Sequence, residues 1–221
     1  TQSPQIASFA GRITIWIQKR SDLRRRMTHD PLAVFYAALQ ASYAGSSDFD
    51  LNPDVVLPPD RALRPAAVLV AYQILAGQPH LVLTKRSSAL KHHPGQIAFP
   101  GGKWDDSDAD ISITALREAH EEIGLVPSAV EVLGQLPSHE TVTGFAVTPV
   151  LGRITCDFDP KAEQGEVAEV FSVPLWHVLN RQNFMIQSRR WRGKRRHYYT
   201  VPYGPYYIWG ATACILRRMI G

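Results

Sequence analysis

Three carboxylates, those of Glu118, Glu121 and Glu122, lie close together in the chain and carry its clearest chemistry. An α-helix has 3.6 residues per turn, so all three side chains fall on one face, where their like charges repel. A hard divalent cation would offset that repulsion, because Mg²⁺ and Mn²⁺ prefer oxygen ligands. The alternative is a solvated helix face on which Arg117 pairs with Glu121, four residues along. Gly124 is the expected end of this helix, since glycine readily adopts a positive φ.

A glycine turn and an acidic loop precede the carboxylate helix. Residues 99–102 (FPGG) predict a strand that ends in a Gly-Gly turn, and the loop that follows is rich in aspartate: Asp105, Asp106, Asp108 and Asp110. Strand, turn, acidic loop and helix together predict a compact site for phosphate and metal.

Residues 102–125 resemble the Nudix hydrolase box, G-x5-E-x7-R-E-U-x-E-E-x-G-U, in which U is aliphatic. The second half of the pattern matches residues 117–125 (REAHEEIGL), with Ala119 as a small stand-in for U. The first half departs from it. One residue more than the pattern allows separates Gly102 from Arg117, and Asp108 stands where the pattern has Glu.

A second, adjoining motif points to a subfamily. Residues 82–102 (VLTKRSSALKHHPGQIAFPGG) are similar to LLTxR[SA]x3Rx3Gx3FPGG, the pattern of Nudix enzymes that hydrolyse coenzyme A, with Val82 for the first Leu and Lys91 for the second Arg. The resemblance covers roughly residues 65–219. It implies metal-dependent cleavage of the pyrophosphate bond of coenzyme A and its derivatives. The products would be 3′,5′-ADP and 4′-phosphopantetheine or its acyl form.

The resemblance also implies roles for the box residues. Glu118 and Glu122 would hold Mg²⁺ or Mn²⁺, with the backbone near Gly102 as a further ligand. Glu121 would hold a second ion or act as the base, and these two roles stay open. Arg117 would brace the carboxylates through a salt bridge. We count Glu118, Glu121 and Arg117 as the catalytic set.

In this family a further acidic residue from a later loop often joins the metals or acts as base. The candidates are Glu140, Glu166 and Glu169. For each of them taken singly, a surface or strand-edge carboxylate is the simpler interpretation.

The substrate phosphates need cationic partners. Arg86 and Lys91 occupy positions that the coenzyme A pattern shares, so we expect both to bind substrate, its 3′-phosphate included, together with the backbone of Gly101 and Gly102. Other candidates in the same segment are Lys85, His92 and His93. A transition-metal site at the two histidines is disfavoured, because no third ligand lies at a suitable spacing.

The composition independently favours a polyanionic ligand. The chain has 221 residues, 45% of them hydrophobic, which fits one domain with an appendage. Its net charge of +4 favours the binding of anionic ligands. Residues 189–196 (RRWRGKRR) hold six basic side chains beside aromatic ones. Such a run suits nucleic acid, although a solvated hairpin tip is the favoured explanation.

Three rival functions therefore remain. Two are enzymatic: a Nudix hydrolase of capped RNA, or one of ADP-ribose or dinucleoside polyphosphates. The third is a non-catalytic Nudix-fold binding module, which is disfavoured because all three box carboxylates are present.

The expected architecture is α/β, and the resemblance sharpens it to a Nudix-type α/β/α sandwich with a mixed sheet. We expect an N-terminal helical arm and linker at 1–60 and the Nudix hydrolase domain at 61–221. In the arm, Asp30 should cap a helix that runs from Pro31 to about residue 43, and 44–59 should be a linker or surface loop. The expected strands are 66–75, 81–86, 97–99, 131–136, 145–154, 167–173 and 206–209, with a hairpin of 184–191 and 197–201. The expected helices are 112–123, 174–180 and 210–219.

Cellular context is expected to be cytoplasmic. No apolar run approaches the ~20 residues of a membrane span, and no signal-peptide pattern opens the chain. Cys156 and Cys214 are far apart in sequence and are expected to be reduced core residues. The expected partner is a small-molecule substrate of the coenzyme A class rather than a membrane, and homodimerisation stays open.

Overall fold

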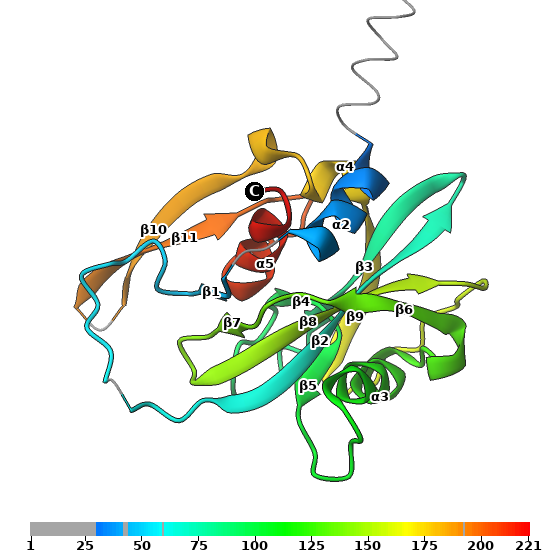
Figure 1. The fold of residues 1–221 in the computed structure, drawn as a ribbon, viewed down its shortest axis with the longest axis horizontal. Helices are drawn as coiled ribbons and strands as arrows, with labels where there is room; N and C mark the ends of the chain where they lie inside the picture. The colour runs from blue at the N-terminus through cyan, green and yellow to red at the C-terminus, as the bar shows by residue number, and fades with distance from the viewer. Residues whose placement is uncertain (1–29, 42–43, 59, 192) are drawn as a thin grey trace, which may run out of the picture.

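The protein was analysed as a computed structural model that describes residues 30–41, 44–58, 60–191 and 193–221. A mixed β-sheet forms its centre. Helix α3 (Ile111–Ile123) covers one face of the sheet, and α2 (Pro31–Gln40), α4 (Leu175–Val178) and α5 (Ala211–Met219) lie over the other, as Figure 1 shows. The expected α/β/α sandwich is thus confirmed.

The described strands of the main sheet follow the order β1-β7-β8-β2-β3-β4, with β5 and β6 added beside β2 and β8 and with β9 beside β3. Strands β2 and β8 run parallel, as do β1 and β7, whereas the other pairs are antiparallel. Their bounds are β1 (Ser46–Ser47), β2 (Arg64–Leu75), β3 (Gln78–Arg86), β4 (Ile97–Ala98), β5 (Gly101–Lys103), β6 (Val130–Gln135), β7 (His139–Glu140), β8 (Phe145–Ile154) and β9 (Val167–Pro174).

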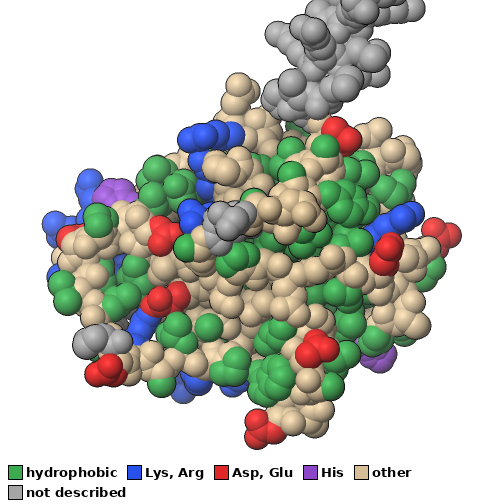
Figure 2. Space-filling view, viewed as in Figure 1, with side chains coloured by type: hydrophobic (Ala, Val, Ile, Leu, Met, Phe, Trp, Pro, Cys, Tyr) green, Lys and Arg blue, Asp and Glu red, His purple; other side chains and the backbone are tan. Residues whose placement is uncertain are grey.

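A separate two-stranded hairpin, β10 (Met185–Trp191) and β11 (Lys194–Thr200), turns at Gly193 as expected. Two short 3-10 turns, Pro127–Ala129 and Arg181–Asn183, complete the described elements. Basic side chains gather on the side of the molecule where this hairpin lies, as Figure 2 shows.

The two faces of the sheet bury two distinct apolar clusters. On one face, α3 places Ala115, Ala119 and Ile123 against the β2 side chains Leu69 and Ala71. The second cluster joins the other face of the sheet to α2, α4 and α5, and its fully buried members include Phe35, Leu83, Leu175 and Leu216. Along β3, alternate residues face opposite clusters, so Val82 packs towards α3 whereas Leu83 packs towards α5.

Helix α3 is fixed at both ends by its own sequence. The Asp110 carboxylate accepts hydrogen bonds from the backbone N–H groups of Ser112 and Ile113, at 2.6 and 3.2 Å. At the other end, Gly124 takes a left-handed φ of 73° and its N–H donates to the His120 carbonyl. The expected helix is confirmed with a start one residue earlier.

The segment expected to be a linker is held on the domain. Its Ser46–Ser47 strand pairs with β7, and the buried His139 ring bonds Ser46 Oγ through Nδ1 and Asp48 Oδ1 through Nε2, at 2.9 and 3.1 Å. Asn52 exchanges two hydrogen bonds with the backbone of His197. Of the two expected forms, a surface loop describes this stretch better than a free linker, because its polar side chains find partners that lie far away in sequence.

Three smaller expectations also need correction. Residues 206–209 make only isolated bridges, Tyr203 to Tyr206 and Thr200 to Trp209, instead of a strand. Helix α2 ends at Gln40, earlier than expected, although Asp30 caps it as predicted. Cys156 is exposed, so only Cys214 is a core cysteine. Among the described residues, no helix is long and apolar enough to cross a bilayer.

Candidate active site

The Glu122 carboxylate is buried where α3 meets β5, because Gly101 and Gly102 lie in this strand and not in the predicted turn. Glu122 is only 5% exposed, and its Oε2 accepts a hydrogen bond from the backbone N–H of Gly101 at 3.1 Å. Burial raises the pKa of Glu122 to about 7, and the Gly101 hydrogen bond only partly opposes that rise. A buried carboxylate with one hydrogen bond is costly to hold charged, so this group is built for a cationic partner.

Glu118 lies one helical turn earlier and faces the same glycines. Burial raises the pKa of its half-buried carboxyl group, while the neighbouring Arg117 guanidinium opposes the rise. A β-carbon on Gly102 would overlap the Glu118 carboxyl group, so a side chain at this position of β5 would displace that carboxylate. The two glycines of β5 therefore form the surface against which the inner carboxylates of Glu118 and Glu122 lie.

Arg117 links the helix to the acidic loop. Its Nη1 donates to Glu118 Oε1 at 2.9 Å and to Glu121 Oε2 at 3.2 Å. Its Nε and Nη2 form a two-pronged pair with the buried Asp108 carboxylate, at 3.0 and 3.1 Å, and Nη2 also reaches the Lys103 carbonyl. The Arg117 guanidinium holds the pKa of Asp108 at about 2, well below its usual range. Arg117 thus forms the salt bridges that its predicted bracing role requires, and Asp108 is its main partner.

The donor chemistry of these residues fits a hard divalent ion. Glu118 Oε2 and Glu122 Oε1 take no part in the hydrogen bonds above, and both groups have raised pKa values that a nearby cation would reverse. Within the described part of the chain, however, no three acidic, His or Cys side chains converge as a ready-made ion cluster. Arg117 holds one oxygen of Glu118 and one of Glu121 in ion pairs.

Arg86 and Glu166 approach the same carboxylates from the strand side. The positive charge of Arg86 lowers the pKa of Glu122, and the negative charge of Glu166 raises those of Glu118 and Glu122, although burial outweighs both effects. The backbone joins the two segments, because the Ser87 N–H donates to the Glu166 carbonyl at 2.8 Å. The structure therefore brings Arg86 and Glu166 together with the box helix.

Other predicted residues lie elsewhere. Lys91 is exposed in the loop between β3 and β4. Glu140, on β7, forms a salt bridge with Arg61. Glu169 faces the α5 side of the sheet, where its carboxylate accepts the Tyr206 hydroxyl at 2.5 Å. Of the three late-loop candidates, Glu166 is the one whose negative charge raises the pKa values of Glu118 and Glu122.

Comparison with known proteins identifies the family. The NUDIX domain model matches residues 63–192, more than half of the chain. The chain belongs to the Nudix family. Among curated relatives, the "Uncharacterized Nudix hydrolase NudL" of Enterobacter sp. (strain 638) is 44% identical over 71% of this chain and 81% of its own, and the Escherichia coli O1:K1 protein of the same name matches equally. The chain is accordingly a Nudix hydrolase, and enzymes of this family generally use divalent metal ions.

Solved Nudix structures resemble this chain more distantly. A Caenorhabditis elegans Ap4A hydrolase is 21% identical, with a TM-score of 0.43 over 49% of this chain and 79% of that one. The Nudix domain of Shewanella oneidensis NrtR, solved with ADP ribose, is 22% identical, with a TM-score of 0.43 over 56% and 81%.

One feature of this Nudix fold had no signal in the sequence motifs. A cavity of about 590 Å³ opens on the α5 side of β3, lined by the strand β3–β4 region, the hairpin and residues 205–209. Its aromatic wall comes from the stretch that was predicted to be a strand. The run of aromatic residues was visible in the sequence, but its interpretation as a strand hid its use as a loop wall.

Proposed function

We propose that this chain is a Mg²⁺- or Mn²⁺-dependent diphosphatase of coenzyme A and its derivatives. The observation that carries the proposal is the folding of residues 82–102 into β3, β4 and β5. This path places Arg86 where its positive charge lowers the pKa of Glu122, and it brings the Gly101 N–H into a hydrogen bond with the same carboxylate. The segment that resembles the coenzyme A pattern thus forms one wall of the carboxylate site.

The reaction requires the negative charge of a pyrophosphate to be neutralised and a water molecule to be positioned. Glu118 and Glu122 would hold the ion, which supplies charge neutralisation and a more acidic water when bound. Arg117, itself held by its pair with Asp108, would orient the carboxylates of Glu118 and Glu121. Arg86 would bind the diphosphate, and Lys91 would reach the substrate from its loop.

The base remains open between two residues. Glu121 is the most exposed of the three box carboxylates, and among the described residues its carboxylate pairs with Arg117 alone. Glu166 is exposed, and its negative charge raises the pKa values of Glu118 and Glu122. Either could accept the proton of the attacking water. The proposed setting is the cytoplasm.

A substrate panel tests the proposal. The native enzyme is incubated with coenzyme A, ADP-ribose, diadenosine polyphosphates and capped RNA, with and without Mn²⁺, and the products are identified by mass. We expect metal-dependent release of 3′,5′-ADP and 4′-phosphopantetheine from coenzyme A at the highest kcat/KM of the panel. Preferential cleavage of another compound would contradict the coenzyme A assignment, and the carboxylates would then serve hydrolysis of that other substrate class.

A further inference from the structure

The cavity on the α5 side of the sheet combines two kinds of lining that rarely coincide by chance. Cationic or basic side chains reach it from three separate segments: Lys85 on β3, His93 in the following loop and Arg189 on β10. Aromatic rings come from a fourth, the stretch of Tyr206, Tyr207 and Trp209. Its volume of about 590 Å³ lies in the range of small-molecule sites.

The aromatic wall is firmly built. The Tyr206 ring stacks on Phe171 of β9 with centroids 3.6 Å apart and planes inclined by 8°. Its hydroxyl donates to Glu169, which fixes that carboxylate as an acceptor in the wall. Tyr207, in contrast, is 44% exposed and leaves its ring available to a ligand. The Arg189 guanidinium lies 4.5 Å from the centroid of Trp209, which holds the charge at the cavity without neutralising it.

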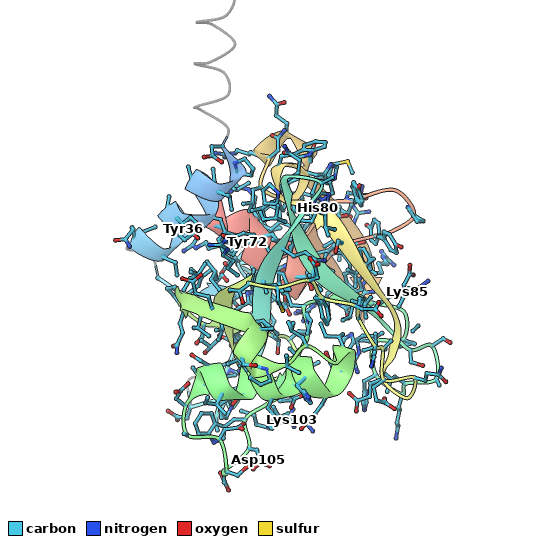
Figure 3. All side chains as sticks on the ribbon, turned by 90° about the vertical axis from the view of Figure 1, so that its right-hand side faces the viewer. Tyr36, Tyr72, His80, Lys85, Lys103 and Asp105 are labelled. Carbon is cyan, nitrogen blue, oxygen red and sulfur yellow. The ribbon has the colours of Figure 1, made fainter. Side chains whose placement is uncertain are left out.

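The cavity and the carboxylate site are neighbours around the edge of the sheet. Lys85, which lines the cavity, directly precedes Arg86, which acts on Glu122. Figure 3 shows Lys85 at the edge of the sheet beside β9, above α3 in that view. Ile97 also lines the cavity and stands four residues before Gly101, so their Cα atoms are at most about 14 Å apart. A nucleoside joined through its 5′-diphosphate can bridge such a separation.

We infer that this cavity binds the 3′-phosphorylated adenosine end of the substrate, with Arg189 and Lys85 on the 3′-phosphate and Tyr207 on the base. The inference rests on the proposed function and adds a subsite to it. It moves the 3′-phosphate contact from Arg86 and Lys91, where the motif alone placed it, to the opposite face of β3. Arg86 then serves the diphosphate.

The lining distinguishes this end of coenzyme A from the other. The pantetheine arm is uncharged and would leave two cations without a partner, whereas a phosphate monoester carries about two negative charges near neutral pH and three acceptor oxygens. A purine offers a π-face to Tyr207 and an exocyclic amino donor to Glu169, whose negative charge would otherwise oppose an anion. Lys85 and Arg189 thus have a counterpart in the 3′-phosphate, Glu169 in the amino group and Tyr207 in the base of a 3′-phosphoadenosine.

Binding of product fragments tests the inference without any turnover. Calorimetry on the full chain, in EDTA, compares 3′,5′-ADP with 5′-AMP, which lacks only the 3′-phosphate. We expect native protein to bind 3′,5′-ADP about ten- to hundredfold more tightly, the effect of one charge-assisted phosphate contact. Arg189→Gln should reduce that preference about tenfold or more. Tyr207→Leu should weaken both ligands by a similar factor, about fivefold or more, because it removes base stacking alone.

Arg190→Gln is the matched control. Arg190 adjoins Arg189 on β10, but strand alternation turns it to the other face of the hairpin and it does not line the cavity. It should keep the native preference. Equal binding of the two nucleotides by native protein, or an unchanged preference in Arg189→Gln, would overturn the inference. So would an equal loss in Arg190→Gln, which would show a diffuse effect of hairpin charge.

Hydrolysis assays separate failure of this subsite from failure of the proposed function. If native enzyme cleaves coenzyme A but Arg189→Gln keeps the native ratio of kcat/KM for coenzyme A over dephospho-coenzyme A, only the subsite is wrong. If native enzyme does not cleave coenzyme A, yet 3′,5′-ADP binds in an Arg189-dependent way, the subsite stands and the proposed function falls.

Discussion

At the scale of single residues, burial is what turns an acidic triplet into a site. Glu122 is almost inaccessible and Glu118 half-buried, whereas the Glu121 side chain is 58% exposed and rests on Arg117. The triplet and its arginine were predictable from residue types and spacing. The depth of each carboxylate was not, because it depends on the approach of Gly101 and Gly102, which belong to another strand.

Glu122→Gln removes the charge and keeps the size of the buried side chain. Turnover should fall by about 10²-fold or more if charge stabilisation through the ion dominates catalysis. The free energy of unfolding should stay the same or rise, because the neutral amide is cheaper to bury. Steady-state kinetics with Mg²⁺ and Mn²⁺ and urea denaturation measure the two effects.

Glu131→Gln is the control for that substitution, since Glu131 lies exposed on β6 away from Gly101 and Gly102. It should leave both quantities unchanged. Near-normal turnover of a folded Glu122→Gln protein would mean that the triplet is only a charged helix face.

Asp108 contributes to stability through its ionised form. Its pKa in the folded protein is about 2, below the ordinary 3.8, so its contribution is complete above the unfolded pKa and is lost as the pH falls towards 2. Asp108→Asn should therefore lower the free energy of unfolding by about 1.5–3 kcal/mol at pH 6, the worth of a charge-assisted hydrogen bond. The difference from native protein should shrink as the pH is lowered to 3.

Urea denaturation at a series of pH values measures that difference, with Asp106→Asn, an exposed neighbour in the same loop, as control. A gap between Asp108→Asn and native protein that does not narrow at low pH would contradict an electrostatic role for the Asp108–Arg117 pair.

At the scale of elements, local signals located most helices and strands, and distant pairing explains the exceptions. Helix α3 was predictable because its cap, its apolar face and its terminal glycine all lie within its own residues. The aromatic stretch 206–209 was predicted as a strand by composition, but Gly204 and Gly210, with φ of 53° and 65°, turn the chain at both sides of it. Strand β1 was unpredictable, since its partner β7 lies more than ninety residues further along the chain.

Asp48 holds β1 on β7. Its carboxylate bonds His139 Nε2 and the Val142 N–H, at 3.1 and 2.8 Å. Asp48→Ala leaves a fully buried imidazole and a backbone donor unsatisfied, so the free energy of unfolding should fall by about 1–3 kcal/mol. Asp54→Ala, at an exposed position of the same segment, should change it little. Chemical denaturation compares the two, and equal stability of both variants would show that this contact is dispensable.

At the scale of the whole molecule, the region matched by the family and the packed unit do not share the same limits. The family match starts at residue 63, and the sequence alone placed the domain at 61–221, a boundary that remains a prediction. Phe35 of α2 nevertheless has no exposed surface and packs edge-on against Tyr72 of β2, with ring centroids 5.2 Å apart. Motif spacing could not reveal this contact, because α2 carries no residue of either motif.

The fragments 30–221 and 61–221 test how far the packed unit extends. Removal of Phe35 alone should cost about 3–5 kcal/mol, the usual loss for a buried aromatic side chain, and 61–221 also loses Asp48 and Asn52. Because domains of this size are stable by only about 5–15 kcal/mol, 61–221 should unfold at a much lower urea concentration than 30–221. Phe35→Ala in the full chain isolates the contribution of α2 if 61–221 does not fold. A fragment 61–221 with the same urea midpoint as 30–221, together with an unaffected Phe35→Ala protein, would show that the domain is complete from residue 61.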